Sequence, residues 1–320
     1  MTRLTSDEEL RLMCKVSMLH YDENLTQEEI SSRLQLSRAR VSRLLAAARN
    51  RGIVQINVTP PVGIHANLEL LLEKQYHLQE AIVIDIPEPS NSDTISRSLG
   101  VAAANFFRHT IRPRDMVGIS WGKTLSSMVS ALATDHFPDL QVVQLIGGLG
   151  APESDVHGTD LCRRMAQQLG CRATLLPAPG IVSSLAAKKA LLSDHHVART
   201  FEHFSEITIA FVGIGSPTPY SVLMRDGTII SQNELHHLLQ KGAVGDIALR
   251  FFDREGRLIE SEINNRVIGI SLEQLKKISR VVGVAGGPDK VQTLYGALKG
   301  ELINTLITDH LTARALINTE

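Results

Sequence analysis

The sequence is poor in cysteine and has no hydrophobic run long enough to cross a membrane. It contains three cysteines, Cys14, Cys162 and Cys171, whose odd number and wide spacing exclude a disulfide framework and favour a reducing compartment. No apolar stretch approaches the roughly 20 residues that a bilayer requires. The first residues, MTRLTSDEEL, carry acids in place of the basic and apolar segments of a signal peptide. These absences predict a cytoplasmic protein without a membrane contact.

The chain also lacks an excess of charge of either sign, because its formal net charge is −1. A contact with nucleic acid must therefore come from a local basic patch and not from the chain as a whole. Its 320 residues, 43% of them hydrophobic, are enough for two domains with substantial cores. We place the boundary at a segment rich in proline and glycine, which predicts domains over residues 1–59 and 60–320.

The segment 25–53 predicts two short helices that are separated by a sharp turn. Thr26 is the expected N-cap of the first helix, and Glu29 completes a capping box. Ser37 is the expected N-cap of the second helix. The turn contains Gln35, although glycine would adopt a left-handed conformation more easily, so we expect about 1 kcal/mol of strain there.

The second of these helices has a basic face. Between Arg33 and Arg51 there are six arginines and no acid, which is the charge distribution expected of a surface that binds phosphates. With a supporting helix near residues 8–20, the segment predicts a helix-turn-helix that binds double-stranded operator DNA. An ordinary solvated helical hairpin is the alternative. The residues predicted to contact DNA are Thr26, Gln27, Ser37, Arg38, Arg40, Ser42 and Arg43.

The rest of the sequence alternates short apolar runs with helical patterns. This alternation is typical of βαβ units and predicts a parallel sheet covered by helices. A short strand is predicted at 53–58. A helix follows from Asn67, and its apolar residues serve either the core, which we favour, or a coiled contact between subunits. The remaining predicted strands are 81–86, 116–120, 142–148, 207–215, 280–287 and the start of 304–317, with helices at 92–109, 124–133, 160–169, 290–299 and the end of 304–317, and a hairpin around 251–260.

Glycine-rich loops follow four of the predicted strands, where an open α/β sheet binds its ligands. In the first loop, Gly122 permits a close approach of the backbone, and Lys123 and Thr124 at a helix N-terminus can donate to an anion such as phosphate. The spacing does not match a Walker A loop, so ATP hydrolysis is not implied. In another loop, Lys290 lies in the first turn of a helix and offers a second positive charge; a solvated surface lysine is the alternative. The other two loops contain Gly147, Gly148, Gly213, Gly215 and Ser216.

Asp246 is an acid among apolar residues, and its burial is costly unless its carboxylate accepts hydrogen bonds. Sugar hydroxyls would donate such bonds, and the nearby backbone is an equally good alternative. The histidines and cysteines match no zinc pattern, because the spacing of His157, Cys162 and Cys171 is irregular and the histidine pairs at 195–196 and 236–237 are expected on exposed helices. We assign no metal ligand and no cofactor.

An ordered set of motifs resembles the SorC/DeoR family of bacterial sugar-responsive transcriptional regulators. The resemblance covers nearly the whole chain. It implies an N-terminal helix-turn-helix and a Rossmann-like α/β domain similar to sugar-phosphate isomerases and glucosamine-phosphate deaminases. It also implies a homotetramer that controls a carbohydrate catabolic operon and whose DNA binding is changed by a phosphorylated sugar. The motifs are LTQEEISSRLQLSRARVSRLL, VGISWGKT, QLIGG, FVGIGSP, KGAVGDI with FFD, and VAGGPDK before GALKG and LITD.

The resemblance also implies the residues of an effector site and the absence of catalysis. The related enzymes place an acid and a histidine after the GIG turn for proton transfer, whereas this chain has the sequence SPTP at 216–219. Ile146 occupies the strand end before Gly147, so nothing there suggests a lysine that captures an aldehyde as a Schiff base. We therefore predict no catalytic residue; a sugar-phosphate isomerase or deaminase with a DNA-binding appendage and an oligomeric scaffold are the alternatives. By position, Gly122, Lys123, Thr124 and Lys290 bind the phosphate, and Gly147, Gly148, Gly213, Gly215 and Asp246 line the rest of the site.

Overall fold

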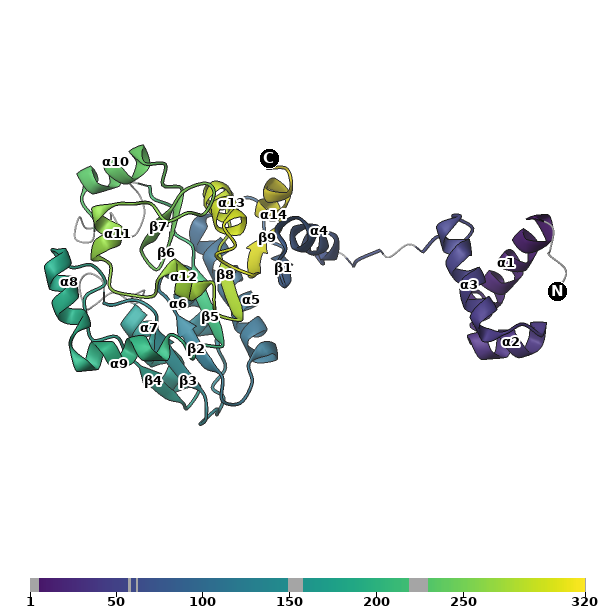
Figure 1. Ribbon diagram of the computed structural model, residues 1–320, viewed down its shortest axis with the longest axis horizontal. Helices are drawn as coiled ribbons and strands as arrows, with labels where there is room; N and C mark the ends of the chain where they lie inside the picture. The colour runs from purple at the N-terminus through teal and green to yellow at the C-terminus, as the bar shows by residue number, and fades with distance from the viewer. Residues whose placement is uncertain (1–5, 57–58, 62, 149–157, 219–229, 320) are drawn as a thin grey trace. The chain divides into compact units, whose positions relative to one another are not determined.

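The chain divides into two compact units, Met1–Pro60 and Pro61–Glu320. The computed structural model describes residues 6–56, 59–61, 63–148, 158–218 and 230–319. The first unit is a three-helix bundle whose small core contains Val16, Ile30 and Val41. Its helices are α1 (Ser6–Tyr21), α2 (Gln27–Leu34) and α3 (Arg38–Asn50) (Figure 1). This arrangement confirms the predicted helical helix-turn-helix.

The second unit is built on a seven-stranded sheet with the order β1-β9-β8-β5-β2-β3-β4. All neighbouring strands in it are parallel, as the sequence predicted. From β2 the chain continues outward to β3 and β4, returns to β5 on the other side of β2, and then proceeds to β8 and β9. The crevice between β2 and β5 is therefore the topological switch point, where open α/β sheets bind ligands. The strands are β1 (Glu80–Ile84), β2 (Met116–Ile119), β3 (Gln141–Gln144), β4 (Arg172–Thr174), β5 (Ile209–Gly213), β8 (Arg280–Val284) and β9 (Thr305–Asp309), with a separate antiparallel pair of β6 (Gly245–Ile247) and β7 (Arg250–Phe252).

Helices cover both faces of this sheet (Figure 1). Because side chains alternate along a strand, β5 contributes to two cores. Ile209 and Phe211 pack with α5 (Ser92–Thr110), α6 (Lys123–Ala131) and α7 (Gly158–Gln168). Its alternate residues, Ala210 and Val212, belong to the core on the other face. The helices that contribute to that core are α4 (Ala66–Tyr76), α9 (His195–His203), α10 (Gln232–Gln240), α11 (Glu262–Arg266), α12 (Leu272–Leu275), α13 (Val291–Lys299) and α14 (His310–Ile317), and α8 (Leu185–Leu192) packs against it.

The strand predicted at 53–58 is wrong for residues 53–56, the part that the structure describes. Ile53 and Val54 pack against the core of the first unit. Their backbone N–H groups donate to the carbonyl of Ala48, at 2.9 and 3.2 Å, and so close the end of α3. A strand needs a neighbouring strand for its hydrogen bonds, and the sequence pattern alone does not show whether one is present.

The helix predicted from Asn67 is α4, and its apolar residues are divided between two environments. Leu72 and Tyr76 are buried in the core of the second unit, which confirms the favoured interpretation. Leu70 and Leu71 remain 64% and 48% exposed. The hairpin predicted around 251–260 is also present, since Phe252 and Leu258 form an antiparallel bridge, although the longer pairing of β7 is with β6.

Candidate DNA interface and effector site

The turn between α2 and α3 has the predicted capping interactions. The Thr26 hydroxyl accepts a hydrogen bond from the Glu29 backbone N–H at 3.3 Å, and the Glu29 carboxylate accepts one from the Thr26 backbone at 2.8 Å. The Thr26 hydroxyl also donates to this carboxylate at 2.8 Å, and the backbone and hydroxyl donors of Thr26 together lower the pKa of Glu29. Ser37 caps α3 by accepting from the Arg40 backbone. Gln35 is left-handed, with φ 51° and ψ 42°, as the turn requires. The capping bonds occupy the Thr26 hydroxyl, and its predicted DNA contact, like that of Gln27, stays a prediction.

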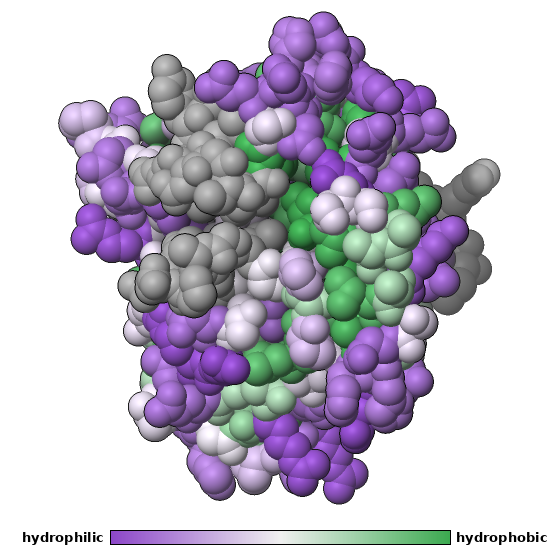
Figure 2. Space-filling model, turned by 90° about the vertical axis from the view of Figure 1, so that its left-hand side faces the viewer, coloured by the Kyte–Doolittle hydropathy of each residue, from purple (hydrophilic) through white to green (hydrophobic). Residues whose placement is uncertain are grey.

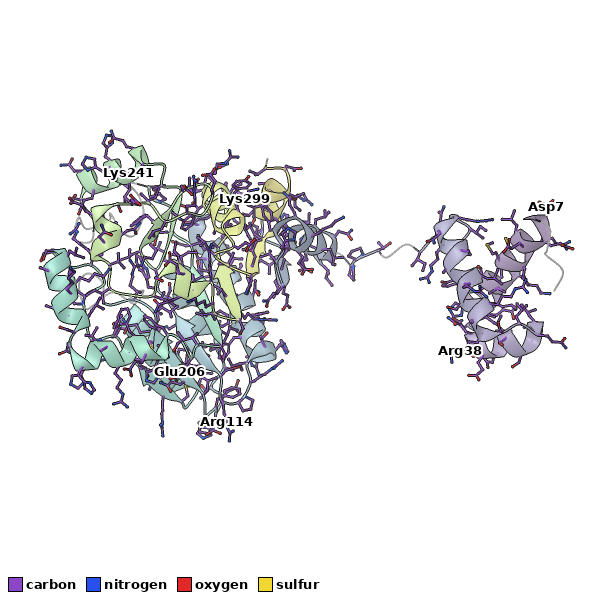
Figure 3. All side chains as sticks on the ribbon, viewed as in Figure 1. Asp7, Arg38, Arg114, Glu206, Lys241 and Lys299 are labelled. Carbon is purple, nitrogen blue, oxygen red and sulfur yellow. The ribbon has the colours of Figure 1, made fainter. Side chains whose placement is uncertain are left out.

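One face of α3 is polar and does not belong to the core of the three-helix bundle. Arg38, Ser42 and Arg43 are exposed, and Arg40 is half-buried at the border of this face; Figure 3 labels Arg38 at the surface of the first unit. Among the described residues, these arginines form no ion pair. Arg33 is different, because it pairs with Glu23 at 3.0 Å. The N-terminal half of α3, the part of a recognition helix that contacts bases, therefore carries uncompensated positive charge.

The loops predicted to hold an effector follow four consecutive strands, β8, β5, β2 and β3. Because the strands are parallel, their carboxyl ends lie at the same edge of the sheet. The loop after β2 begins helix α6 at Gly122, which has a φ of 121°, and no side chain caps the helix. The space beside Gly122 is open, because a Cβ there would meet no described atom within 4 Å. The first amides of α6 are thus available to an anion.

Lys123 and Thr124 have partners on the neighbouring helix α5. Lys123 Nζ lies 3.0 Å from the Asp93 carboxylate, and both side chains are exposed. The Thr124 hydroxyl lies 3.5 Å from that of Ser96. An anion at α6 would therefore compete with Asp93 for Lys123, and the predicted roles of Lys123 and Thr124 stay predictions.

The buried Asp246 and the half-buried Lys290 carry opposite charges beside the loop after β5. Gly215 and Asp246 exchange two backbone hydrogen bonds of 2.9 Å. Lys290 Nζ donates to the Ile214 carbonyl at 3.0 Å. Burial raises the pKa of Asp246 to about 6, and the positive charge of Lys290 opposes this increase. Burial likewise lowers the pKa of Lys290. The structure thus brings together three predicted site residues, Gly215, Asp246 and Lys290.

One carboxylate oxygen of Asp246 lacks a hydrogen bond. Oδ2 accepts a hydrogen bond from the Leu249 backbone N–H at 3.2 Å. For this oxygen the partner is therefore the nearby backbone, which was the predicted alternative to a sugar hydroxyl. Oδ1 is buried and has no hydrogen-bond partner among the described residues. A buried carboxylate oxygen without a donor is costly, and a ligand hydroxyl would satisfy it.

The other predicted glycines have close neighbours that explain the absence of a side chain. A Cβ on Gly147 would overlap the carbonyl of Ala178, and a Cβ on Gly213 would lie 2.9 Å from the carbonyl of Trp121. At Gly148 there is space, since a Cβ there would lie 3.9 Å from Thr159 Oγ1. Tight packing accounts for Gly147 and Gly213 without a ligand, and their role in binding stays a prediction. His157 and Pro219 lie outside the described residues.

Asp309 is a buried residue of this edge to which the sequence analysis gave no role. Its Oδ2 accepts hydrogen bonds from the Gly287 N–H and the Thr312 hydroxyl, both at 2.7 Å. A Cβ on Gly286 would overlap the same oxygen. Asp309 therefore fixes the loop that carries Lys290. An acid at the end of a buried strand and just before a helix was the available signal.

A hollow with a volume of about 720 Å³ lies elsewhere in the second unit. Glu80 and Arg280, which line it, are the first residues of β1 and β8 and form an ion pair of 2.9 Å. It runs along the edge strand β1 beside α5, away from the loops that carry Asp246 and Lys290. The effector residues expected from the sequence do not line this hollow.

Comparison with known proteins gives matches over both units. Residues 61–318 match the family described as "Putative sugar-binding domain", and residues 16–51 match Sigma-70, region 4. The chain is 34% identical to the deoxyribonucleoside regulator of Bacillus subtilis (strain 168), over 97% of this chain and 98% of that protein. It is 31% identical to the transcriptional regulator LsrR of Enterobacter sp. (strain 638), over 98% and 94%.

A solved structure extends the similarity to the whole fold. The full-length sorbitol operon regulator SorC from Klebsiella pneumoniae superposes with a TM-score of 0.75 at 28% identity, covering 98% of this chain and 100% of that one. A helix-turn-helix with a free basic face, joined to an α/β unit with a buried carboxylate and a half-buried lysine beside its switch point, is the architecture of a ligand-responsive DNA-binding regulator.

The chain belongs to the SorC/DeoR family of sugar-binding transcriptional regulators. It is a sugar-responsive regulator that binds DNA through its helix-turn-helix. The relatives are transcriptional regulators, which confirms the prediction that the chain is not an enzyme. Among the described residues, no helix is long and apolar enough to span a membrane.

Proposed function

We propose that a phosphorylated sugar, bound at the carboxyl ends of β2, β5 and β8, controls the binding of this regulator to operator DNA of a carbohydrate catabolic operon. The observation that carries the proposal is the buried carboxylate of Asp246 together with the half-buried ammonium of Lys290, both beside the loop that follows β5, one of the two strands of the switch point. A cation and an unsatisfied carboxylate oxygen on the same side of the sheet suit a ligand with an anionic end and a hydroxyl-rich end.

The phosphate end is supported by the groups around Gly122. The uncapped N-terminus of α6 offers backbone amides and the positive end of the helix dipole. Lys290 follows β8, and only β5 lies between β8 and β2 in the sheet. Lys123 would contribute after exchanging its partner Asp93. The amides would bind the phosphate whichever sugar carries it. This end of the site would therefore add affinity but would not select the sugar.

The sugar end is supported by Asp246. Its Oδ1 can accept from a hydroxyl, which would remove the cost of an unsatisfied buried oxygen. The relative from Bacillus subtilis is named a deoxyribonucleoside regulator, and the sugar of a deoxyribonucleoside is a pentose. Pentose phosphates are therefore the first ligands to test, followed by hexose and alditol phosphates.

We also propose a homotetramer, as the resemblance implies. A tetramer with dihedral symmetry needs two different self-complementary surfaces. One candidate is the exposed side of α4 with Leu70 and Leu71. A second is offered by α8 and α10, where Leu185 and Leu239 are 50% and 44% exposed. Figure 2 views the molecule from the side on which Figure 1 draws these helices, and hydrophobic groups lie between hydrophilic ones on that side. The effector would act by favouring one arrangement of the DNA-binding units.

Trp121 offers a direct test of effector binding. It is the one tryptophan of the chain, it is almost fully buried, and it precedes Gly122. We expect its fluorescence to change when a sugar phosphate binds and to remain unchanged with the same sugar without phosphate. Lys290→Met should weaken binding about 10- to 100-fold, the value of one hydrogen bond to a charged group. Lys299→Met, at the exposed end of α13, the helix that begins directly after Lys290, is the matched control and should bind normally (Figure 3).

The DNA interface is tested separately by band shift with DNA from the promoter region of the gene. Arg43→Ala and Arg40→Ala should each weaken binding by about 1 to 3 kcal/mol if the arginine contacts a base. Arg114→Ala, an exposed arginine of the second unit (Figure 3), should leave the affinity unchanged. Equal affinity of all three variants and the parent chain would remove α3 from the interface.

A further inference from the structure

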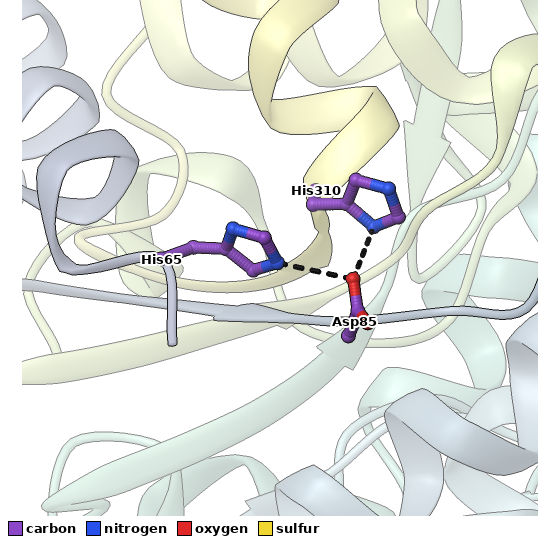
Figure 4. Close-up of side chains that lie close together, drawn as sticks. All are labelled: His65, Asp85 and His310. Carbon is purple, nitrogen blue, oxygen red and sulfur yellow. Dashed lines mark hydrogen bonds and ion pairs between the residues drawn. The ribbon is translucent and has the colours of Figure 1, made fainter. Parts of the chain in front are cut away.

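Two histidines and an aspartate from distant parts of the sequence meet at the carboxyl end of the edge strand β1 (Figure 4). Asp85 directly follows β1, His65 directly precedes α4, and His310 is the first residue of α14. No local motif joins these three residues, and they are not among the histidines and cysteines that the sequence offered as candidate metal ligands. The parallel sheet brings them together, since β1 pairs with β9 and β9 leads into α14.

The three side chains converge on one point. His65 Nε2 lies 3.2 Å and His310 Nδ1 3.3 Å from the same oxygen, Asp85 Oδ1. The ligand atoms of all three residues lie within 4.8 Å of one another. The two imidazole rings are stacked, with centroids 5.1 Å apart and planes inclined by 9°.

His310 shows why this cluster differs from an ordinary surface ion pair. Its side chain is 9% exposed. Its Nδ1 is buried and makes no hydrogen bond among the described residues, although Asp85 Oδ1 is close. On the other side of the ring, Nε2 lies 3.6 Å from the Glu88 carboxylate. A proton on Nε2 would face Glu88 and leave the lone pair of Nδ1 directed at the cluster.

We propose that His65, Asp85 and His310 bind a divalent transition metal ion, with zinc as the best match. Two imidazole nitrogens and one carboxylate oxygen are a donor set that zinc prefers, with water as the fourth ligand. Bond lengths of about 2.0 to 2.1 Å in a tetrahedral site place neighbouring ligand atoms about 3.3 Å apart. The two nitrogen–oxygen distances already have this value, and only the separation of the two nitrogens has to decrease, by at most about 1.5 Å.

Glu88 supports His310 from outside the coordination sphere. A carboxylate that accepts the second N–H of a ligating histidine fixes its tautomer and raises its basicity. Glu88 lies in the loop that follows β1, and its carboxylate faces His310 Nε2 in this way. Hard oxygen-seeking cations such as Mg²⁺ are a poor match, since two of the three donors are imidazole nitrogens.

This metal site is separate from the effector site. β1 is the edge strand of the sheet, and β9, β8 and β5 lie between it and β2. The ion would connect the segment that enters the second unit, at His65, to the sheet at Asp85 and to α14 at His310. It would thereby fix the start of α4, the helix that also exposes Leu70 and Leu71. The site therefore has a structural function that is independent of the sugar ligand.

The proposal is tested on the full chain by removing metal with a chelator and adding back Zn²⁺. We expect one tightly bound Zn²⁺ per chain and a higher melting temperature of the second unit. His65→Gln and Asp85→Asn should each lose both effects, and they keep the test valid if His310→Gln does not fold because His310 is buried. Glu88→Gln should bind Zn²⁺ about 10- to 100-fold more weakly, as expected for an outer-sphere partner.

His195→Gln is the matched control, because it removes one histidine of an exposed pair on α9 and should leave the stoichiometry unchanged. Visible absorption of bound Co²⁺ with the intensity of a tetrahedral site should appear in the parent chain and in His195→Gln, and be absent from His65→Gln. The proposal is overturned if the parent chain binds no Zn²⁺ and its melting temperature stays the same when Zn²⁺ is added. It is also overturned if His65→Gln and Asp85→Asn bind Zn²⁺ as tightly as the parent chain.

Discussion

Replacing Asp246 by asparagine removes a buried negative charge and keeps the shape of the side chain. Asp246 is 3% exposed, and burial raises its pKa from 3.8 to about 6. At 1.36 kcal/mol per pKa unit, this difference corresponds to about 3 kcal/mol of destabilisation at neutral pH. The carbonyl oxygen of the new asparagine can still accept the Leu249 hydrogen bond, so the variant should be more stable by at most this amount, less what Lys290 loses with its partner.

The sign of the pH dependence follows from the raised pKa. Between about pH 4 and pH 6, the folded protein binds a proton at Asp246 that the unfolded chain has released. The stability that this proton confers is therefore present below pH 4 and is lost as the pH rises through 6. The advantage of the asparagine variant over the parent chain should grow across this window and remain constant above it. Groups that both proteins share cancel in the comparison.

The assay is urea or thermal unfolding of both proteins between about pH 4 and pH 8, a range that includes the window in which the protonation of Asp246 changes the stability. About 3 kcal/mol would raise the melting temperature of a domain of this size by about 6 to 12 °C. The same variant should lose the response of Trp121 to sugar phosphates, because the acceptor of the sugar hydroxyl is altered. An asparagine variant that is less stable at pH 8 than the parent chain, or that keeps full affinity for the effector, would refute this reasoning.

Three further predictions concern stability, the effector site and thiol reactivity. Gln35→Gly should stabilise the first unit by up to about 1 kcal/mol in urea unfolding, because glycine adopts the left-handed conformation without strain; a loss of stability would contradict this. Gly215→Ala should abolish the fluorescence response to effector, since its methyl group would overlap the Asp246 carboxylate, and a normal titration would show that the pair does not bind ligand. In the native protein, Cys14 should react rapidly with a thiol reagent and Cys162 slowly, because Cys14 is exposed and burial raises the pKa of the Cys162 thiol to about 12; equal rates would show that the Cys162 helix opens readily.

Local patterns predicted the helical unit in detail because the interactions that define it are local. The Thr26 and Ser37 caps, the left-handed Gln35 and the free arginines of α3 all depend on residues within one or two turns. The alternation of strands and helices likewise predicted the parallel sheet. It failed at residues 53–56, where the chain closes a helix end and has no neighbouring strand in the described structure.

Contacts between distant segments could not be predicted from the sequence. The loops after β2, β5 and β8 were expected to share an edge, but the close contact of Gly215 with Asp246 depends on the β6–β7 hairpin folding back over β5. The role of Asp309 in fixing the Gly287 loop depends on adjacent strands. The meeting of His65 with His310 depends on the pairing of β1 with β9, which lie at opposite ends of the unit in sequence.

The most direct test of the account is the affinity of the full chain for operator DNA, measured with a sugar phosphate and with the same sugar lacking phosphate. An effector that acts through two states changes the affinity typically 5- to 150-fold. We predict a change of this size with one pentose, hexose or alditol phosphate, none with its unphosphorylated form, and none with Lys290→Met at the same concentration. The account would be contradicted if no sugar phosphate changed operator affinity, or if the free sugar acted as strongly as its phosphate.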